Sequence, residues 1–186
     1  NQSGPRENMV WTSSPLKELL VYRCAASHCS QAVTMLGTST DNQDIFVVDC
    51  EFREFFDFGC YLGGVRLAVI GNKVSRSAET HLIRVWHTRG CFISENTLLY
   101  PSCVINAGRH ALKLHAVGME GENITRDVVI TDNRFKGSTY IVQVSPSSLW
   151  DKSLIENVLF ERNTLECDHM TQVMLWLMAK QVTVRH

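Results

Sequence analysis

Two segments of the 186-residue chain carry cationic and titratable side chains in a pattern suited to chemistry. The first is Arg84-Val85-Trp86-His87, and the second is His110-Ala111-Leu112-Lys113-Leu114-His115. In an extended strand, residues two apart point to the same side, so Arg84 aligns with Trp86 and Lys113 with His115. A permanently charged guanidinium beside an amine and an imidazole can bind a carboxylate and move a nearby proton.

The elements that would position these side chains belong to a repeat that runs along the chain. Seven β-rich runs end in Asn, Cys or His at positions 24, 50, 72, 96, 133, 163 and 186, with spacings from 22 to 37 residues. A mean period of about 27 residues is typical of a solenoid. We expect each bend Asn to adopt left-handed backbone geometry and to donate its amide to the next coil. This ladder comprises Asn72, Asn96, Asn133 and Asn163, with Cys24 and Cys50 continuing it as small plugs.

A second β-like run follows the first six anchors, and several of these runs alternate with the period of two that is typical of strands. Aligning them predicts an inward column of aliphatic residues: Leu36, Leu62, Ile83, Val85, Leu112, Leu114, Val142, Val144, Leu175 and Leu177. One outward column comprises Met35, Tyr61, Arg84, Lys113, Gln143 and Trp176. The column two residues further along comprises Gly37, Gly63, Trp86, His115, Ser145 and Met178.

The repeat predicts an all-β fold, a right-handed single-stranded parallel β-helix of about seven coils. A leucine-rich repeat is the alternative, because Leu67-x-Val69-x-x-Asn72 satisfies its consensus. The variable spacing, the lack of Leu dominance and the second alternating run favour the β-helix. Seven coils about 4.8 Å apart would form a rod about 30 Å long.

Composition limits the classes of partner. Lys and Arg total 18 against 19 acids, a formal net charge of −1, which argues against a dedicated nucleic-acid or anionic-membrane binder. The longest apolar run, Val173–Ala179, is far shorter than the ~20 residues of a membrane-spanning helix. The seven cysteines lack metal-like spacing and are expected mostly in the core. No metal or cofactor is predicted, although Glu120, Glu122 and Asp127 offer a candidate Ca²⁺ cluster.

Residues 1–186 are expected to form a single β-helix domain, or a piece of a longer chain. Residues 1–15 would provide a partial N-terminal cap, and the sequence ends mid-coil at His186. Uncapped coils expose sheet edges, so end-to-end or other homo-oligomeric contact is a further expectation.

The outward columns combine cations with large aromatic rings. Trp and Tyr present flat apolar plates to sugar rings, while Arg84 and Lys113 offer charge-assisted bonds to carboxylate or sulfate. An acidic polysaccharide fits both, with Trp86, Gln143, Trp176, His87 and His110 as binding residues. Alternatively, the tryptophans pack under loops and the cations pair with acids. The long connections 100–109, 117–126 and 145–154 flank this surface and place the expected centre at the fourth coil.

The alternating coils, the Asn bends and the segments around Arg84 and Lys113 resemble the pectate-lyase-like β-helix superfamily. The resemblance covers nearly the whole chain but includes no family signature motif. It implies polysaccharide lyase, epimerase or hydrolase activity on the outward strand face. Some alginate- and chondroitin-type lyases of this shape use a Lys and an Arg on neighbouring coils. The pair Lys113 and Arg84 is similar to that arrangement. The clustered Asp residues and Gly-His-Gly of pectinase-type hydrolases are absent from the sequence.

A lyase would divide the work among four residues. Arg84 would neutralise the substrate carboxylate, and Lys113 would act as base because a neighbouring cation and partial burial lower its pKa. His115 or Tyr61 would supply the proton to the leaving oxygen. Such a protein would be extracellular or periplasmic. The competing hypothesis is a non-catalytic glycan-binding, adhesion or fibre-type β-helix.

Overall fold

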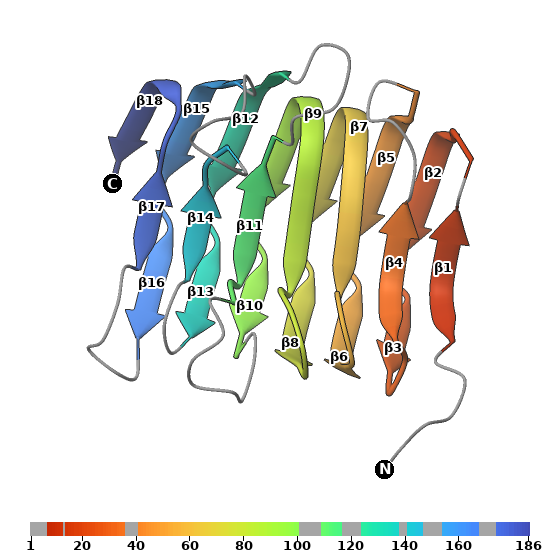
Figure 1. Cartoon of the computed structure of the whole chain (residues 1–186). Helices are drawn as coiled ribbons and strands as arrows, with labels where there is room; N and C mark the ends of the chain where they lie inside the picture. The colour runs from red at the N-terminus through yellow and green to blue at the C-terminus, as the bar shows by residue number, and fades with distance from the viewer. Residues whose placement is uncertain are drawn as a thin grey trace.

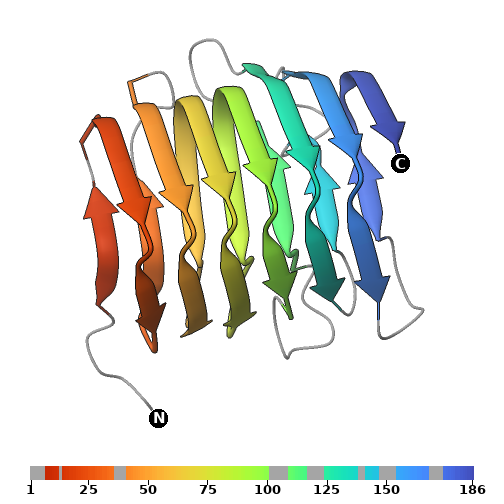
Figure 2. The ribbon, with the colours of Figure 1, turned by 180° about the vertical axis from the view of Figure 1, so that it is seen from behind.

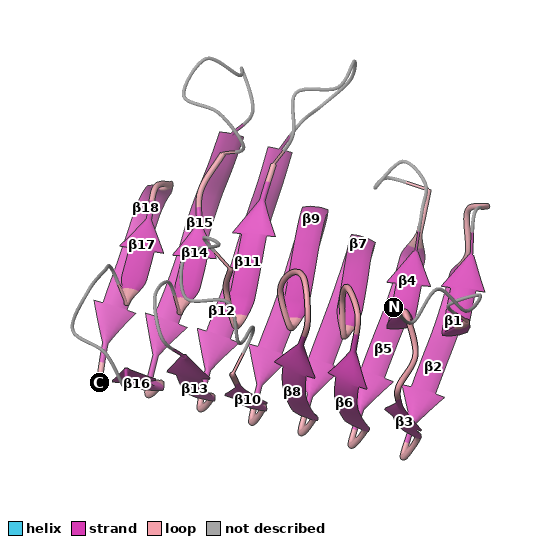
Figure 3. Cartoon of the chain, turned by 60° about the horizontal axis from the view of Figure 1, so that its bottom comes forward, coloured by secondary structure: helices cyan, strands magenta, loops and turns pink. Residues whose placement is uncertain are grey.

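The computed structural model describes residues 7–12, 14–35, 41–100, 109–116, 124–137, 141–146, 154–167 and 174–186. Their regular elements are all β-strands, and every pair of neighbouring strands is parallel (Figure 3). Within these residues, no helix is long and apolar enough to cross a membrane. The predicted all-β parallel solenoid is therefore confirmed.

The strands form three stacked faces. The front face contains β1 (Asn8–Thr12), β4 (Gln31–Met35), the first part of β7 (Cys60–Ile70), the first part of β9 (Ile83–Ser94), β11 (Leu112–His115), β14 (Val142–Val144) and β17 (Leu175–Leu177), seen side by side in Figure 1. The back face contains β2 (Lys17–Tyr22), β5 (Gln43–Val48), the second parts of β7 and β9, β12 (Ile124–Thr131), β15 (Leu154–Glu161) and β18 (Lys180–Arg185), seen in Figure 2. The short face contains β3 (Ala25–Ser27), β6 (Glu51–Phe55), β8 (Lys73–Ser77), β10 (Thr97–Leu99), β13 (Arg134–Gly137) and β16 (Thr164–Cys167).

Six described strands line the short face and seven line the front face. The number of turns complete on all three faces is therefore slightly smaller than the seven coils expected. Strands β7 and β9 each continue from the front face to the back face. Gly64 allows this in β7, because its φ of +145° suits glycine and a Cβ there would lie 2.7 Å from the Asn42 carbonyl oxygen.

Aliphatic side chains from the three faces fill the interior. The predicted inward residues from Leu62 to Val144 are completely or almost completely buried, while Leu175 and Leu177 are partly buried in an outer coil. Phe52 and Phe135 fill the core from the short face. Burial of each such side chain contributes about 1.5 to 3 kcal/mol.

The asparagine ladder is present. The Nδ2 of Asn72, Asn96 and Asn133 each donates to the Oδ1 of the next ladder residue over 2.9 Å. The backbone N–H of Cys50 donates to Asn72 Oδ1, which extends the ladder toward the N-terminus. The left-handed residue differs from the expectation, because it is the one before each of the first six anchors: Arg23, Asp49, Gly71, Glu95, Asp132 and Arg162. The anchor Asn therefore follows the bend.

The alignment of the first coil was wrong by one residue. Trp11 pairs with Thr34, and Thr34 pairs with Tyr61, so Thr34 occupies the outward column in place of Met35. Met35 is buried in the core at 1% exposure. Leu36 and Gly37 lie outside the described residues.

Candidate functional site

One outward row of the front face collects the cations and aromatic residues identified in the sequence. Consecutive strand pairs place its members in register: Trp11, Thr34, Tyr61, Arg84, Lys113, Gln143 and Trp176. We call these seven residues the front row. Neighbouring members are about 4.8 Å apart at the backbone. Arg84 and Lys113 are thus adjacent near the middle of the row. Their strands, β9 and β11, lie side by side in Figure 1.

Arg84 is held by aromatic rings and one histidine. Its guanidinium carbon lies 5.1 Å from the centre of the Tyr61 ring and 5.6 Å from that of Phe58. Those two rings stack with centroids 4.9 Å apart. Its Nε donates to His115 Nε2 over 2.9 Å. Burial lowers the pKa of Arg84 from its ordinary value, but an arginine remains charged at working pH.

Lys113 is partly buried next to that cation. Burial is the main cause that lowers the pKa of Lys113, and the charge of Arg84 lowers it further. The pKa of Tyr61 is raised, chiefly by burial, so its phenol retains a proton to donate. The front row therefore combines the permanent positive charge of Arg84, a Lys113 ammonium that loses its proton more readily than usual, and the protonated phenol of Tyr61.

Arg84 and Lys113 lack a carboxylate partner among the described residues, unlike most arginines there. On the other faces, Arg76 pairs with Glu54 at 2.8 Å and Arg134 with Glu166 at 2.7 Å. Asp57 favours the charged form of Arg84 from beyond ion-pair distance, and its oxygens accept hydrogen bonds from Gln31 and Thr80. Two partly buried neighbouring cations without an ion-paired acid have the chemistry to bind an external anion.

His115 lies beside Trp86 in the second outward row but is buried at 3% exposure. Burial, followed by the charges of Arg84 and Lys113, lowers its pKa to about 3. Because Nε2 accepts from Arg84, the proton of this neutral ring is on Nδ1. Nδ1 and the Trp86 Nε1 are both buried, and neither has a hydrogen-bond partner within the described structure. His115 is therefore placed to orient Arg84.

Two further histidines lie beside the cations. His81 Nδ1 accepts a hydrogen bond from the His110 backbone N–H over 3.0 Å, and the two Nδ1 atoms are 3.2 Å apart. Burial and nearby charges lower the pKa of His81 to about 2 and that of His110 to about 3. His87 lies inside β9 with a φ of 47°, and its ring contacts Trp86.

The remaining expected binding residues are spread along the front row. Gln143 neighbours Lys113 and donates to the Ser145 hydroxyl, whereas Trp176 is one strand further away and 41% exposed. Trp86 is partly buried, and its ring centroid lies 5.2 Å from that of Tyr61. Phe58 and His81 were absent from the predicted site. Both residues lie at the corners just before β7 and β9, outside the regular strand alternation from which the outward columns were predicted.

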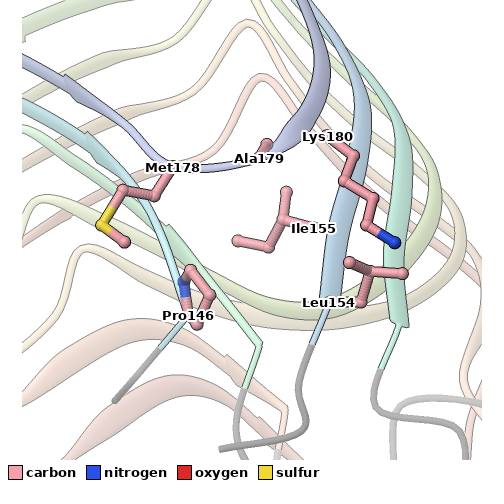
Figure 4. Close-up of a pocket in the computed structure, with 6 residues that line it drawn as sticks. All are labelled: Pro146, Leu154, Ile155, Met178, Ala179 and Lys180. Carbon is pink, nitrogen blue, oxygen red and sulfur yellow. The ribbon is translucent and has the colours of Figure 1, made fainter. Parts of the chain in front are cut away.

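A separate pocket of about 290 Å³ lies where β14, β15, β17 and β18 meet (Figure 4). Its walls are mostly apolar, and Lys180 is its charged member. The lining residues are Pro146, Leu154, Ile155, Met178, Ala179 and Lys180. None of the paired cations or aromatic rings of the front row lines it, so it offers no acid–base chemistry of the predicted kind.

The acidic residues of the candidate Ca²⁺ cluster lie largely outside the described residues, which omit Glu120 and Glu122. Asp127 is described and accepts a hydrogen bond from Asn157 Nδ2. No group of three or more His, Cys, Asp or Glu suited to a metal ion occurs in the described part of the chain. Residues 101–108, 117–123 and 147–153 of the expected flanking loops, including Trp150, are also outside it.

The buried histidines predict a loss of stability in acid. In the folded protein the pKa values of His81, His110 and His115 are about 2 to 3, whereas an unfolded histidine titrates near pH 6.5. As the pH falls below about 6.5, the unfolded chain therefore binds protons that the folded protein does not. We expect His115→Gln to reduce by about 1 to 3 kcal/mol the stability lost between about pH 7 and 4.5. Urea unfolding at both pH values measures this.

The control for that experiment is His186→Gln, because His186 is exposed. Its stability loss between the two pH values should match that of the wild type. An equal loss in His115→Gln would show that His115 does not titrate as its burial requires.

A scan against protein-family models, a search of curated proteins and a search of solved structures each found no match. The class defined by the observations is thus a parallel β-solenoid with a paired cation and aromatic site on one face.

Proposed function

We propose that the front row binds an acidic, uronate-containing polysaccharide. The observation that supports this is the pair Arg84 and Lys113, partly buried, adjacent and without a carboxylate in the described structure. Tyr61, on the same row, presents a flat apolar ring on which a sugar can stack, and the exposed Trp176 lies further along the row. A chain of linked uronates supplies both carboxylates for the cations and ring faces for the aromatic side chains.

We further propose that the same site catalyses β-elimination, as the resemblance to pectate-lyase-like proteins implies. Arg84 pairs with the carboxylate and stabilises the charge that develops on it. The neutral amine of Lys113 removes the proton from the carbon next to that carboxylate, and these electrons form the new carbon–carbon double bond. The bond from the adjacent carbon to the glycosidic oxygen breaks, and the Tyr61 phenol gives the leaving oxygen a proton.

Tyr61 suits the acid role better than His115. Its raised pKa keeps the phenol protonated, whereas the His115 ring is neutral and its Nε2 already accepts from Arg84. The elimination written above requires only the substrate and the side chains of Arg84, Lys113 and Tyr61. We propose an extracellular or periplasmic location for the protein, because that is where such a substrate would be met.

A non-catalytic glycan-binding module is the second candidate function. Exposed Trp11 and Trp176 stand at opposite ends of the front row, which suits contact along a polymer.

Incubation with polygalacturonate, alginate and glycosaminoglycans separates the two functions. The ultraviolet absorbance of unsaturated uronate reports elimination, and isothermal titration calorimetry with the same polymers reports binding. Turnover supports the lyase, while binding without turnover supports the module. Absence of both across the panel would overturn the proposal.

Arg84→Ala is expected to weaken polyuronate binding by about 10- to 100-fold, because it removes a charge-assisted and partly desolvated contact. Arg134→Ala is the matched control, since Arg134 on the short face is already paired with Glu166. Calorimetric titration of both variants should show a loss only for the first. Equal affinities of the two variants would show that Arg84 does not bind the polyuronate.

The lowered pKa of Lys113 predicts opposite pH dependences for binding and turnover. As the pH rises through this pKa, below the ~10.4 of an ordinary lysine, the ammonium is lost and affinity falls. The neutral base accumulates over the same range, so the turnover rate rises. Affinities and initial rates measured at constant salt from about pH 6 to 10 test this. Parallel changes of both quantities would contradict the base assignment.

A further inference from the structure

The back face carries a continuous row of apolar side chains that point away from the core. Parallel pairing places Leu20, Phe46, Ala68, Phe92, Val129 and Leu159 in register on successive strands. We call these six residues the apolar ridge. Its neighbours along each strand point inward, as Val47 and Ile93 show by their complete burial. The ridge is thus an outward row and not part of the core.

The ridge is exposed and wider than one residue. Leu20 is 60% exposed and Phe92 40% exposed, and the other four are partly exposed. Two residues further along the strands, Tyr22, Val48 and Ile70 form a second apolar row across the first three coils. Outward positions of a solvated sheet are ordinarily polar, so a long apolar row marks an interaction surface.

The borders of the ridge exclude a highly charged partner. On one side, Arg66 pairs with Asp44, and on the other Arg162 pairs with Asp132 at 2.8 Å and Arg23 with Asp49 at 3.9 Å. Charges on both borders are therefore largely neutralised within the chain. These paired charges present no net electrostatic field that would attract a nucleic acid or an anionic membrane. The partner that fits the ridge is therefore an apolar protein surface.

The spacing of the ridge suits a second copy of this chain. Its side chains repeat every ~4.8 Å, the distance between paired strands, over six of the seven strands of the back face. An α-helix, with a pitch of 5.4 Å, falls out of step with this repeat within a few turns. An identical ridge has the same repeat, so the side chains of two copies can interdigitate along its full length.

The area of the back face sets the expected strength. Seven strands span about 29 Å, and the five residue steps from the Lys17 row to the Tyr22 row span about 17 Å. Two copies would cover about 1,000 Å² in total, which is at the lower limit for a specific interface. We propose that the ridge is the interface of a reversible homodimer, packed back face to back face, with micromolar affinity.

The symmetry of such a dimer makes Phe92 its central residue. Phe92 lies on β9, the fourth of the seven strands of the back face. A two-fold axis through the middle of the seven strands passes at Phe92 and brings it against Phe92 of the partner subunit. This holds whether the two stacks run in the same or in opposite directions.

Sedimentation velocity of the wild type from about 1 to 200 µM tests the proposal, with conversion from monomer to dimer expected across this range. Phe92→Lys should remain monomeric throughout, because it places two like charges at the axis. Trp176→Lys is the control, since it removes a comparably exposed aromatic residue from the front face, and it should dimerise normally. Circular dichroism checks that each variant is folded.

Phe92→Cys provides a second measurement that does not depend on weakening the dimer. Under mild oxidation it should form a disulfide-linked dimer well above the wild-type background from the native cysteines. A wild type that is monomeric at all concentrations would overturn the proposal. So would a Phe92→Lys variant that still dimerises, or a ridge that binds phospholipid vesicles without any dimer.

Discussion

We expect Lys113→Arg to retain most of the affinity for polyuronate while losing about 100-fold or more of the turnover rate. The guanidinium keeps the positive charge beside Arg84 but cannot lose a proton at working pH, so it cannot serve as a base. Lys113→Ala should lose the same turnover and in addition about tenfold in affinity. Initial rates from the absorbance of unsaturated uronate and calorimetric affinities measure the two effects separately.

Lys73→Ala is the control for this pair, because Lys73 is exposed on the short face. It should match the wild type in both measurements, and circular dichroism should show that all three variants are folded. An unaffected rate in both Lys113 variants would sink the assignment of the base. Wild-type binding without any turnover would instead identify a glycan-binding module.

Asn96→Ala is expected to lower the free energy of unfolding by about 3 to 5 kcal/mol. Asn96 is 1% exposed in the middle of the ladder. Its Nδ2 donates to Asn133 Oδ1 and the Val69 carbonyl oxygen, and its Oδ1 accepts from the Asn72 side chain and backbone. Alanine removes these four hydrogen bonds from the buried ladder, although Asn133 Oδ1 still accepts from the backbone N–H of residue 96 and Asn72 Nδ2 still donates to the Val47 carbonyl oxygen. Urea unfolding monitored by circular dichroism measures the loss.

The matched substitution is Asn163→Ala, at the outer end of the asparagine ladder. Asn163 is partly exposed, so water can replace the bonds it makes to Asn133 and Ile130. Its loss should be about half that of Asn96→Ala or less. Similar small losses at both positions would show that the ladder hydrogen bonds contribute little to stability.

The fold was predictable because its signals are local and repeated. The anchors Asn72, Asn96, Asn133 and Asn163 and the alternation between Ile83 and Trp86 can be read within a few residues. The alignment of β4 failed because apolar residues occupy both phases of the run 32–36. Only the pairing of Thr34 with Tyr61 shows which phase faces inward.

The neighbourhood of Arg84 and Lys113 was also predictable, since equivalent positions on adjacent coils must pair. Their lack of acidic partners was not, because it depends on the placement of every carboxylate. The Arg84–His115 hydrogen bond joins residues 31 positions apart, and no local pattern encodes it. The apolar ridge can be read in the alternation of the first β-rich runs, as in Phe46-Val47-Val48, whereas the columns predicted above comprise the second runs alone.

The stacked arrangement has a consequence for how the protein opens. Each strand pairs only with its neighbours on the same face, so cooperative unfolding proceeds through neighbouring coils, and fraying begins at the outer ones. Arg84 and Lys113 lie on the fourth and fifth of the seven front-face strands. Backbone amides around the two cations should therefore exchange with solvent deuterium more slowly than those of β1 or β18, so the proposed anion site stays ordered while peripheral coils fluctuate.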